Sequence, residues 1–373
     1  ARRNKMTVDS KLIEMSRRYG SDPDMVLAGG GNTSYKTKEY LTVKASGYPL
    51  STIDDSGFVM LDRGLLKLMW HKTYADEENE RETQVLTDLM ASRRFGEVNR
   101  PSVESQLHDL FPYQYVLHVH PAKVNGLTCS IEGENWTNSR LAQQAVWVEA
   151  TKPGYILAMT CQKISQEHQK TTGQFPKIMI LENHGIFFSA DTVDEIDQLV
   201  ALVFDTIQED LHTAPDFTKE PFDEPLVNQA HQILDKVFPE NAIFFDRFHS
   251  LVELVADERS VQPIMKPFTP DHIVYCRHEP LFCTSQTLQA TLEAYREKNA
   301  VLPRIILIQH LGMFSAAETA ASAKVARDLF LDQIKIAYYA RSFGGIKPMK
   351  SEHIEFIRNW EVEHYRAKME SKS

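Results

Sequence analysis

Two segments of this chain repeat one pattern, and the repetition constrains the fold more than any other feature. Residues 176–187 read Pro-Lys-Ile-Met-Ile-Leu-Glu-Asn-His-Gly-Ile-Phe, and residues 303–314 read Pro-Arg-Ile-Ile-Leu-Ile-Gln-His-Leu-Gly-Met-Phe. Each segment continues through a serine into a long amphipathic stretch. A short apolar run bounded by proline and glycine is typical of a buried strand. We therefore predict two strand–glycine–helix units related by duplication, with chance similarity between two common units as the alternative.

The second copy differs from the first at the residues that could carry chemistry. Leu311 occupies the position of His184, and His310 occupies that of Asn183. A weaker repeat relates residues 151–157 to residues 269–275. We expect the second copy to be a degenerate, structural module.

A pair of histidines closes an apolar strand in the first half of the chain. Residues 116–121 read Val-Leu-His-Val-His-Pro, so that His118 and His120 are two positions apart. Side chains at i and i+2 of a strand point to the same face, and these two imidazoles can therefore converge on one ion. His184 follows a second apolar run. Three imidazoles with one open position are typical of a catalytic zinc site; the alternative is three core histidines.

Composition places the chain among globular proteins of more than one domain. Its 373 residues are 42% hydrophobic and 25% charged, and this length suggests two domains. No apolar run reaches membrane-spanning length, and no apolar segment follows the basic N-terminal residues, so we expect neither a membrane anchor nor a secretory signal. The four cysteines are scattered and form no CxxC pair. We expect reduced core thiols in a cytoplasmic protein.

The charge of the chain excludes some partners. The formal net charge is −10, which disfavours a general nucleic-acid binder because such a protein needs a basic surface. A small phosphorylated substrate stays possible, since one local pocket suffices to bind it.

Hydrophobic periodicity outlines the elements between these motifs. We expect helices at 11–19, 59–70, 80–91, 163–170 and 191–210, strands at 25–28, 40–44, 116–121 and 178–181, and a further apolar segment at 155–159. The proline-rich, acidic stretch 212–225 reads as a linker. We therefore predict a first module at 1–215, a second at 226–345 and a helical tail at 346–373.

Several motifs, taken together, resemble the class II aldolase/adducin family, which includes fuculose- and rhamnulose-phosphate aldolases and ribulose-phosphate 4-epimerases. They lie at residues 29–34, 44–47, 101–104, 118–120 and 183–185. The closest similarity is to the aldolase portion of bifunctional rhamnulose-1-phosphate aldolase/alcohol dehydrogenases, through residues 101–108, 152–155 and 359–363. The resemblance covers essentially the whole chain, and we expect no dehydrogenase half. It implies two α/β/α sandwich modules around mostly antiparallel sheets, an α/β (α+β) fold.

The resemblance also implies a metal site with an acid/base residue beside it. His118, His120 and His184 match the metal ligands of the family, and Glu104 matches its acid/base carboxylate. The expected metal is one Zn²⁺ per chain, with another divalent metal as an alternative. A carboxylate that only caps a helix or faces solvent is the alternative for Glu104.

A phosphate site is implied by the same resemblance. The matching positions are Gly31, Asn32, Ser46, Gly47 and Ser102. Thr33 adds a hydroxyl to the same glycine-rich loop, and Lys36 or Lys44 could supply charge. Val103 departs from the family, because the short aldolases have a second serine at this position.

These features together predict a zinc-dependent aldolase. The substrate class would be a ketose 1-phosphate similar to rhamnulose 1-phosphate, which would be cleaved through an enediolate to dihydroxyacetone phosphate and a short aldehyde. The alternatives are a sugar-phosphate epimerase, a sugar-acid phosphate decarboxylase, or a non-enzymatic adducin-like interaction protein. We expect a small phosphorylated sugar as the partner, neither nucleic acid nor membrane, and a homo-oligomer, either a dimer or a dimer of dimers.

Overall fold

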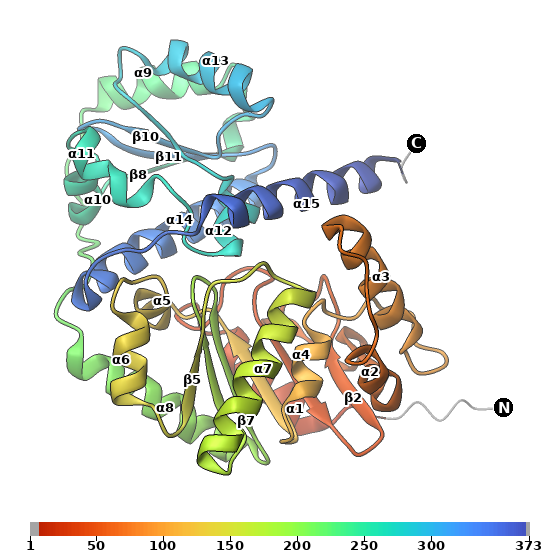
Figure 1. Ribbon diagram of the computed structural model, residues 1–373. Coiled ribbons are helices and arrows are strands. Elements are labelled where there is room, and N and C mark those ends of the chain that lie inside the picture. Colours follow the sequence, from red (N-terminus) through yellow and green to blue (C-terminus); the bar gives the residue numbers. More distant parts are fainter. Residues whose placement is uncertain (1–6, 371–373) are drawn as a thin grey trace. The chain divides into compact units, whose positions relative to one another are not determined.

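The computed structural model describes the backbone of residues 7–370 and the side chains of residues 7–360. The chain divides into two compact units. The first unit comprises the residues up to 124 together with 133–210, and the second comprises 125–132 together with the residues from 211 onward. The module boundaries drawn from the sequence remain a prediction. Both units mix helices with a β-sheet, which confirms the predicted α/β (α+β) class (Figure 1).

In the described part of the first unit, seven strands form one sheet in the order β3-β2-β1-β4-β7-β6-β5. Their bounds are β1 Asn32–Lys36, β2 Tyr40–Lys44, β3 Phe58–Asp62, β4 Tyr115–Val119, β5 Ala145–Val148, β6 Ile178–Leu181 and β7 Gly185–Ala190. All neighbours are antiparallel except the pair β5 and β6. β4, which carries His118, therefore lies at the centre of a mostly antiparallel sheet.

Helices cover both faces of this sheet (Figure 1). One face carries α1 Ser10–Gly20 and α8 Val193–Asp210. The other carries α2 Arg63–Met69, α3 Glu78–Ala91, α4 Ser105–Leu110 and α7 Tyr155–Thr172. The remaining helices of this part of the chain are α5 Ala122–Thr128 and α6 Gly133–Arg140. Under α4 and α7, side chains such as Phe111, Leu157 and Met179 form a buried apolar cluster.

Three of the elements expected from the sequence are wrong. Residues 25–28 form turns, in which the N–H groups of Met25 and Val26 donate to the carbonyl of Asp22. The expected helix at 59–70 is a strand followed by a helix, because 58–62 pair with β2 and Asp62 then caps α2 by accepting from the Leu65 N–H. The apolar segment 155–159 and the expected helix 163–170 are one helix, α7.

The second unit is built on a smaller sheet with the order β8-β11-β10-β9. Its strands are β8 Ile243–Asp246, β9 Leu281–Cys283, β10 Ile305–Ile308 and β11 Gly312–Ala316. α14 Ala320–Ala340 covers one face, and α9 Glu224–Leu234 and α13 Leu288–Asn299 cover the other. The other helices are α10 His249–Leu254, α11 Glu258–Val261, α12 Pro270–Cys276 and α15 Ser351–Glu370.

The repeat seen in the sequence recurs in the strand pairing. In both sheets a parallel pair (β5 with β6, β9 with β10) is followed by an antiparallel hairpin and then by a second antiparallel neighbour, β4 or β8. Leu181 pairs with Gly185, and Ile308 pairs with Gly312 in the same way. The predicted strand–glycine–helix unit therefore occurs in both sheets with the same pairing, and its origin by duplication stays a prediction.

The prediction that residues 151–157 and 269–275 correspond to each other in the fold is wrong. The first segment leads into α7, which follows β5, whereas the second forms α12, which precedes β9. The helix that corresponds to α7 is α13, since both join the two parallel strands of their sheet.

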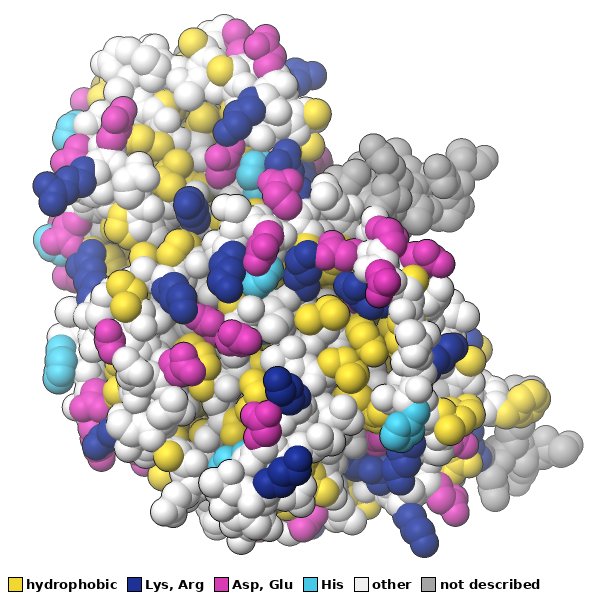
Figure 2. All heavy atoms as spheres, viewed as in Figure 1, with side chains coloured by type: hydrophobic (Ala, Val, Ile, Leu, Met, Phe, Trp, Pro, Cys, Tyr) yellow, Lys and Arg dark blue, Asp and Glu magenta, His cyan; other side chains and the backbone are white. Residues whose placement is uncertain are grey.

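Other expectations concern the thiols and the surface. All four cysteines are buried and none is in a disulfide, as expected. On the face shown in Figure 2, acidic and basic side chains are interspersed rather than gathered into a basic stripe. No described helix is long and apolar enough to cross a membrane.

Candidate metal centre

Three imidazoles meet at one edge of the first sheet. His118 lies near the end of β4, His120 follows that strand, and His184 lies in the turn between β6 and β7. One nitrogen of each ring lies within 4.8 Å of the others. The Nε2 atom of His118 is 3.0 Å from that of His120 and 3.3 Å from that of His184. The structure thus brings together the three histidines singled out in the sequence.

The neighbours of His118 fix the orientation of its ring. Its Nδ1–H donates to the Ile186 carbonyl at 3.0 Å, and the ring stacks on Phe187 with centroids 3.9 Å apart. Both residues lie on β7, which pairs with β4 so that His118 faces Phe187. Because Nδ1 carries the proton, Nε2 presents its lone pair to the other two rings.

Gly185 allows the rings to come this close. A Cβ atom at this position would lie 2.6 Å from the Val119 carbonyl oxygen and 2.7 Å from Cδ2 of His120. Such distances are far below van der Waals contact. The His-Gly sequence therefore supplies a ligand and, directly after it, the space in which a second ligand packs.

The arrangement of nitrogens suits a divalent cation. Four-coordinate zinc binds imidazole nitrogen at about 2.0–2.1 Å, which at tetrahedral angles separates the nitrogens by about 3.4 Å. The observed separations of 3.0 and 3.3 Å are close to this value. A single lone pair on His118 Nε2 cannot accept well from two neighbouring N–H groups at once, whereas a cation accepts all three lone pairs. The donor set therefore fits a metal ion.

Glu104 lies beside the three rings. Its Oε1 atom is 3.4 Å from Nε2 of His184 and 3.6 Å from Nε2 of His118. The residue stands at the N-cap of α4, but its side chain makes no capping hydrogen bond and is only 12% exposed. Glu104 is therefore neither a helix cap nor a surface acid.

A series of hydrogen bonds holds Glu104 in place, and it includes His108, which the sequence indicates as a core or supporting residue rather than a ligand. Asn32 donates from Nδ2 to Oε2 of Glu104 at 2.6 Å. Its Oδ1 is bonded to Nε2 of His108, and Nδ1 of His108 is 2.7 Å from the Ser34 hydroxyl. Burial lowers the pKa of His108 well below its usual range, so the ring is neutral at pH 7 and donates through one nitrogen only. Glu104, at the N-cap of α4, and His108 are four residues apart, a spacing that places two side chains on the same side of a helix.

Most of the residues predicted to form the phosphate site lie near the hydrogen bonds that link Glu104, Asn32 and His108. Asn32 pairs directly with His118 across the sheet, and a Cβ on Gly31 would lie 2.8 Å from the His118 carbonyl oxygen. The Ser102 hydroxyl accepts from the Glu104 N–H at 3.2 Å.

Ser46 joins the loop at 44–47 to the segment directly before Ser102. Its N–H donates to the Arg100 carbonyl at 2.9 Å, and its hydroxyl donates to that of Pro101 at 3.3 Å. Gly47 follows with φ +87° and open space around its Cα, a conformation that favours glycine.

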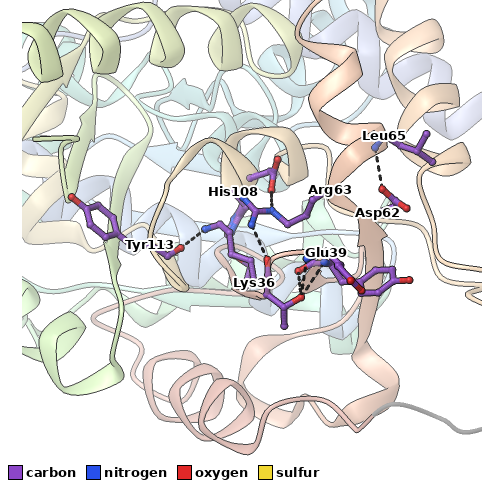
Figure 3. Close-up of polar contacts among 11 residues, drawn as sticks. Lys36, Glu39, Asp62, Arg63, Leu65, His108 and Tyr113 are labelled. Carbon is purple, nitrogen blue, oxygen red and sulfur yellow. Dashed lines mark hydrogen bonds and ion pairs between the residues drawn. The ribbon is translucent and has the colours of Figure 1, made fainter.

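Two other residues of the expected site point elsewhere. The Thr33 hydroxyl lies 2.6 Å from that of Ser16 on α1. Thr33 therefore points to the opposite face of β1 from Asn32. Lys36 is buried and donates from Nζ to the Tyr113 carbonyl at 2.6 Å (Figure 3). Burial lowers its pKa to about 7. Lys44 is also buried, in β2.

Comparison with known protein families assigns the chain to a family. Residues 10–205 match the model described as Class II Aldolase and Adducin N-terminal domain. The chain belongs to the class II aldolase and adducin family. A second model, Aldolase class II, second domain, matches residues 296–368.

Individual relatives are more distant. The chain is 23% identical over 411 residues to a Bacillus subtilis (strain 168) protein named uncharacterized oxidoreductase YuxG, a match that covers 95% of this chain and 58% of that protein. The chain thus spans little more than half the length of this relative.

Among solved structures, the N-terminal class II aldolase domain of a conserved protein from Thermoplasma acidophilum is 27% identical, with a TM-score of 0.45 and coverage of 56% of this chain and 97% of that one. An L-fuculose-1-phosphate aldolase from Thermus thermophilus is 15% identical, with a TM-score of 0.34 and coverage of 53% and 93%.

Proposed function

We propose that this class II aldolase family member is a zinc-dependent lyase. It cleaves a ketose 1-phosphate similar to rhamnulose 1-phosphate into dihydroxyacetone phosphate and a short aldehyde, by way of an enediolate. The observation that carries the proposal is the placement of the Glu104 carboxylate within 3.6 Å of two convergent imidazoles. A carboxylate in this position can move a proton at a carbon next to the ketone of the substrate.

His118, His120 and His184 are the residues that hold the metal in this proposal. When bound, a divalent cation supplies Lewis-acid stabilisation of the negative charge that develops on the substrate oxygens. The His118 ring is already held in the orientation of a ligand, because its Nδ1–H donates to the Ile186 carbonyl and its face stacks on the Phe187 ring. A preorganised site loses little energy to reorganisation during the reaction.

Glu104 is the acid/base residue of the proposal, and Asn32 orients it. The Asn32 amide occupies Oε2, which directs Oε1 toward the imidazoles. Because the carboxylate is only 12% exposed, bulk water has limited access to it. It is thus suited to transfer a proton to and from one carbon of the substrate.

The substrate phosphate is assigned to the loops around Gly31 and Ser46. Backbone N–H groups in loops that contain left-handed glycines form concave anion sites, and Gly31 and Gly47 both have positive φ. Asn32 and Ser102 are polar side chains at the junction of these loops with Glu104. The substrate would then lie between the phosphate loops and the three histidines.

Other functions are compatible with the fold of this chain. An epimerase or a sugar-acid phosphate decarboxylase would share the metal and the phosphate site, and would differ in the bond that is made or broken. A non-enzymatic, adducin-like role is disfavoured because all three imidazoles converge on one point. We also propose that the protein binds a small phosphorylated sugar, is located in the cytoplasm, and assembles into a dimer or a dimer of dimers.

The direct experiment incubates the zinc-loaded chain with a panel of ketose 1-phosphates, ribulose 5-phosphate and sugar-acid phosphates. We expect dihydroxyacetone phosphate and an aldehyde to appear in equal amounts from a ketose 1-phosphate. Release of carbon dioxide, or a change in configuration without cleavage, would replace the aldolase by one of its alternatives.

The metal assignment is tested by His120→Ala. We expect loss of bound zinc and at least a hundredfold loss of activity, because three nitrogen ligands become two. The control is His71→Ala, which removes an exposed histidine of the same unit. Metal analysis with circular dichroism separates ligand loss from unfolding. Stoichiometric zinc in folded His120→Ala contradicts the assignment.

A further inference from the structure

The second unit has side chains of a different kind at the place that corresponds to the metal centre. Val119 pairs with Ile186 in the first sheet, and Asp246 pairs with Met313 in the second. A Cβ on Gly312 would lie 2.6 Å from the Asp246 carbonyl oxygen, as one on Gly185 would from that of Val119. This common register places Phe245, Arg247 and Leu311 where the first unit has His118, His120 and His184.

A cavity of about 270 Å³ opens at this place in the second unit. Its walls include Phe222, Leu226, Arg247, Ser285, Gln309 and Leu311. These residues come from the segment before α9, α9 itself, the end of β8, the loop after β9 and the turn between β10 and β11 (Figure 1). A cavity of roughly 150 Å³ is enough to hold benzene. The second unit therefore has room for a small organic molecule.

Arg247 is the cation of this cavity, and it is held rigidly. Its Nε–H donates to the Pro221 carbonyl at 2.6 Å, and its Nη1 donates to the carbonyls of His310 and Leu311, each at 2.7 Å. A guanidinium has five N–H groups, so these bonds use three. No described residue accepts a hydrogen bond from Nη2. This guanidinium, which lines the cavity, thus has two N–H groups without an acceptor among the described residues.

The rest of the wall limits what these donors can bind. Pro221, Phe222 and Leu226 give it an apolar side. Asp223 also lines it, and its carboxylate already accepts the Leu226 N–H as the cap of α9. One guanidinium beside one carboxylate favours a ligand with a single negative charge over a phosphate dianion, which Asp223 would repel more strongly.

We propose that the second unit binds a small monocarboxylate with an apolar body. Its carboxylate accepts from Nη2 of Arg247, and its hydrocarbon part packs on Phe222 and Leu226. In this view the duplicated module exchanged three metal ligands for an anion site at the same position of the fold. The site is independent of the aldolase reaction proposed for the first unit.

Calorimetric titration of the full chain with benzoate tests the proposal, with benzyl alcohol and phenyl phosphate as matched probes. We expect saturable benzoate binding with a dissociation constant of about 1 mM or below. Benzyl alcohol should bind at least about tenfold more weakly, because it lacks the charge that Arg247 recognises. Equal or tighter binding of either matched probe, or no saturation by benzoate, overturns the proposal.

Variants locate the site. Arg247→Gln should weaken benzoate binding at least about tenfold. Because Arg247 also holds three carbonyls, Leu226→Trp is the second variant: it fills the cavity, leaves Arg247 in place and should abolish binding. Leu226→Ala removes one apolar contact but leaves the cavity open, so it should weaken binding less than Leu226→Trp does. His120→Ala should bind benzoate as the unchanged chain does. Loss of binding in His120→Ala, or its survival in folded Leu226→Trp, places the ligand elsewhere and overturns the proposal.

Discussion

At the residue scale, the orientation of the side chains at the metal centre is set by hydrogen bonds on their far side. Each of these side chains has a second polar atom that is bonded to a neighbouring group. His118 presents Nε2 to its neighbours because Nδ1 is committed to a backbone carbonyl. Asn32 can hold Glu104 because its own oxygen is bonded to His108. Each of these bonds removes a competing orientation of a side chain. The residues behind the ligands thus determine how well the ligands are placed.

Glu104→Gln separates proton transfer from metal binding. The amide is nearly the same size and can still accept from Asn32, but it cannot take up a proton. We expect zinc content to be unchanged, and hydrogen–deuterium exchange at the carbon next to the ketone of dihydroxyacetone phosphate to fall at least a hundredfold. Glu167→Gln, at an exposed position of α7, is the control. Exchange at the normal rate in Glu104→Gln would assign the base to another residue.

Lys36 should make stability depend on pH. Burial lowers its pKa from the ordinary 10.5 to about 7 in the folded chain. Between these values the unfolded chain binds a proton that the folded chain does not, so the free energy of unfolding rises with pH, by at most about 1.4 kcal/mol per pH unit. Below pH 7 both states are protonated, and the cost of burying the charge is complete.

Lys36→Met removes this dependence. We expect urea unfolding between pH 7 and 10 to show a smaller rise of the free energy of unfolding in the variant than in the unchanged chain. Lys38→Met is the matched control, because this exposed lysine lies just beyond the end of β1. Parallel pH curves for Lys36→Met and the unchanged chain would show that Lys36 keeps an ordinary pKa.

At the scale of elements, the two sheets contain hairpins of the same geometry that carry different functional groups. The turns that follow β6 and β10 both contain a left-handed residue, Asn183 or His310, followed two positions later by a glycine. In the first unit this turn presents His184 to a metal centre. In the second it presents the carbonyls of His310 and Leu311 to Arg247. The backbone geometry is retained while the chemistry of the side chains differs.

Gly185→Ala and Gly312→Ala test this correspondence. The added methyl at 185 meets the His120 ring and should displace it, and we expect zinc affinity to fall at least about tenfold. The methyl at 312 meets the backbone of β8 and should destabilise the second unit by roughly 1–3 kcal/mol without a change in zinc affinity. Zinc titration and thermal unfolding measure the two effects. Equal zinc affinity in both variants would contradict the role of Gly185.

At the scale of the whole molecule, the two units are not separated by a single cut in the sequence. Residues 125–132, which form the second half of α5 and the loop before α6, belong to the second unit although the segments on both sides of them belong to the first. There the N–H groups of Ile131 and Glu132 donate to the carbonyls of Gly345 and Phe343. Removal of residues 226–373 would strip this segment of its partners. We therefore expect such a truncated chain to be less stable than the full one.

We predict one zinc ion per chain. The described residues contain one group of three convergent metal ligands, in the first unit, and the corresponding positions of the second unit are Phe245, Arg247 and Leu311. Elemental analysis combined with native mass measurement gives both the metal content and the number of chains, for which we expect two or four. Two zinc ions per chain would contradict the view of the second unit as catalytically empty.

Features that depend on near neighbours in the chain could be predicted from the sequence alone. The two-residue spacing on a strand placed His118 and His120 on one face, and the repeated strand–glycine–helix pattern indicated two related sheets. Such features follow from backbone periodicity, which a short segment carries on its own.

Contacts between distant segments, in contrast, became known only from the folded structure. The bond from Asn32 to Glu104, the place of His108 behind it and the membership of residues 125–132 in the second unit depend on how the elements pack. The same holds for Arg247, whose correspondence to His120 becomes visible only through the pairing of β8 with β11. A side chain's partner across the fold is set by burial and by the sum of many contacts, and short sequence patterns do not contain that information.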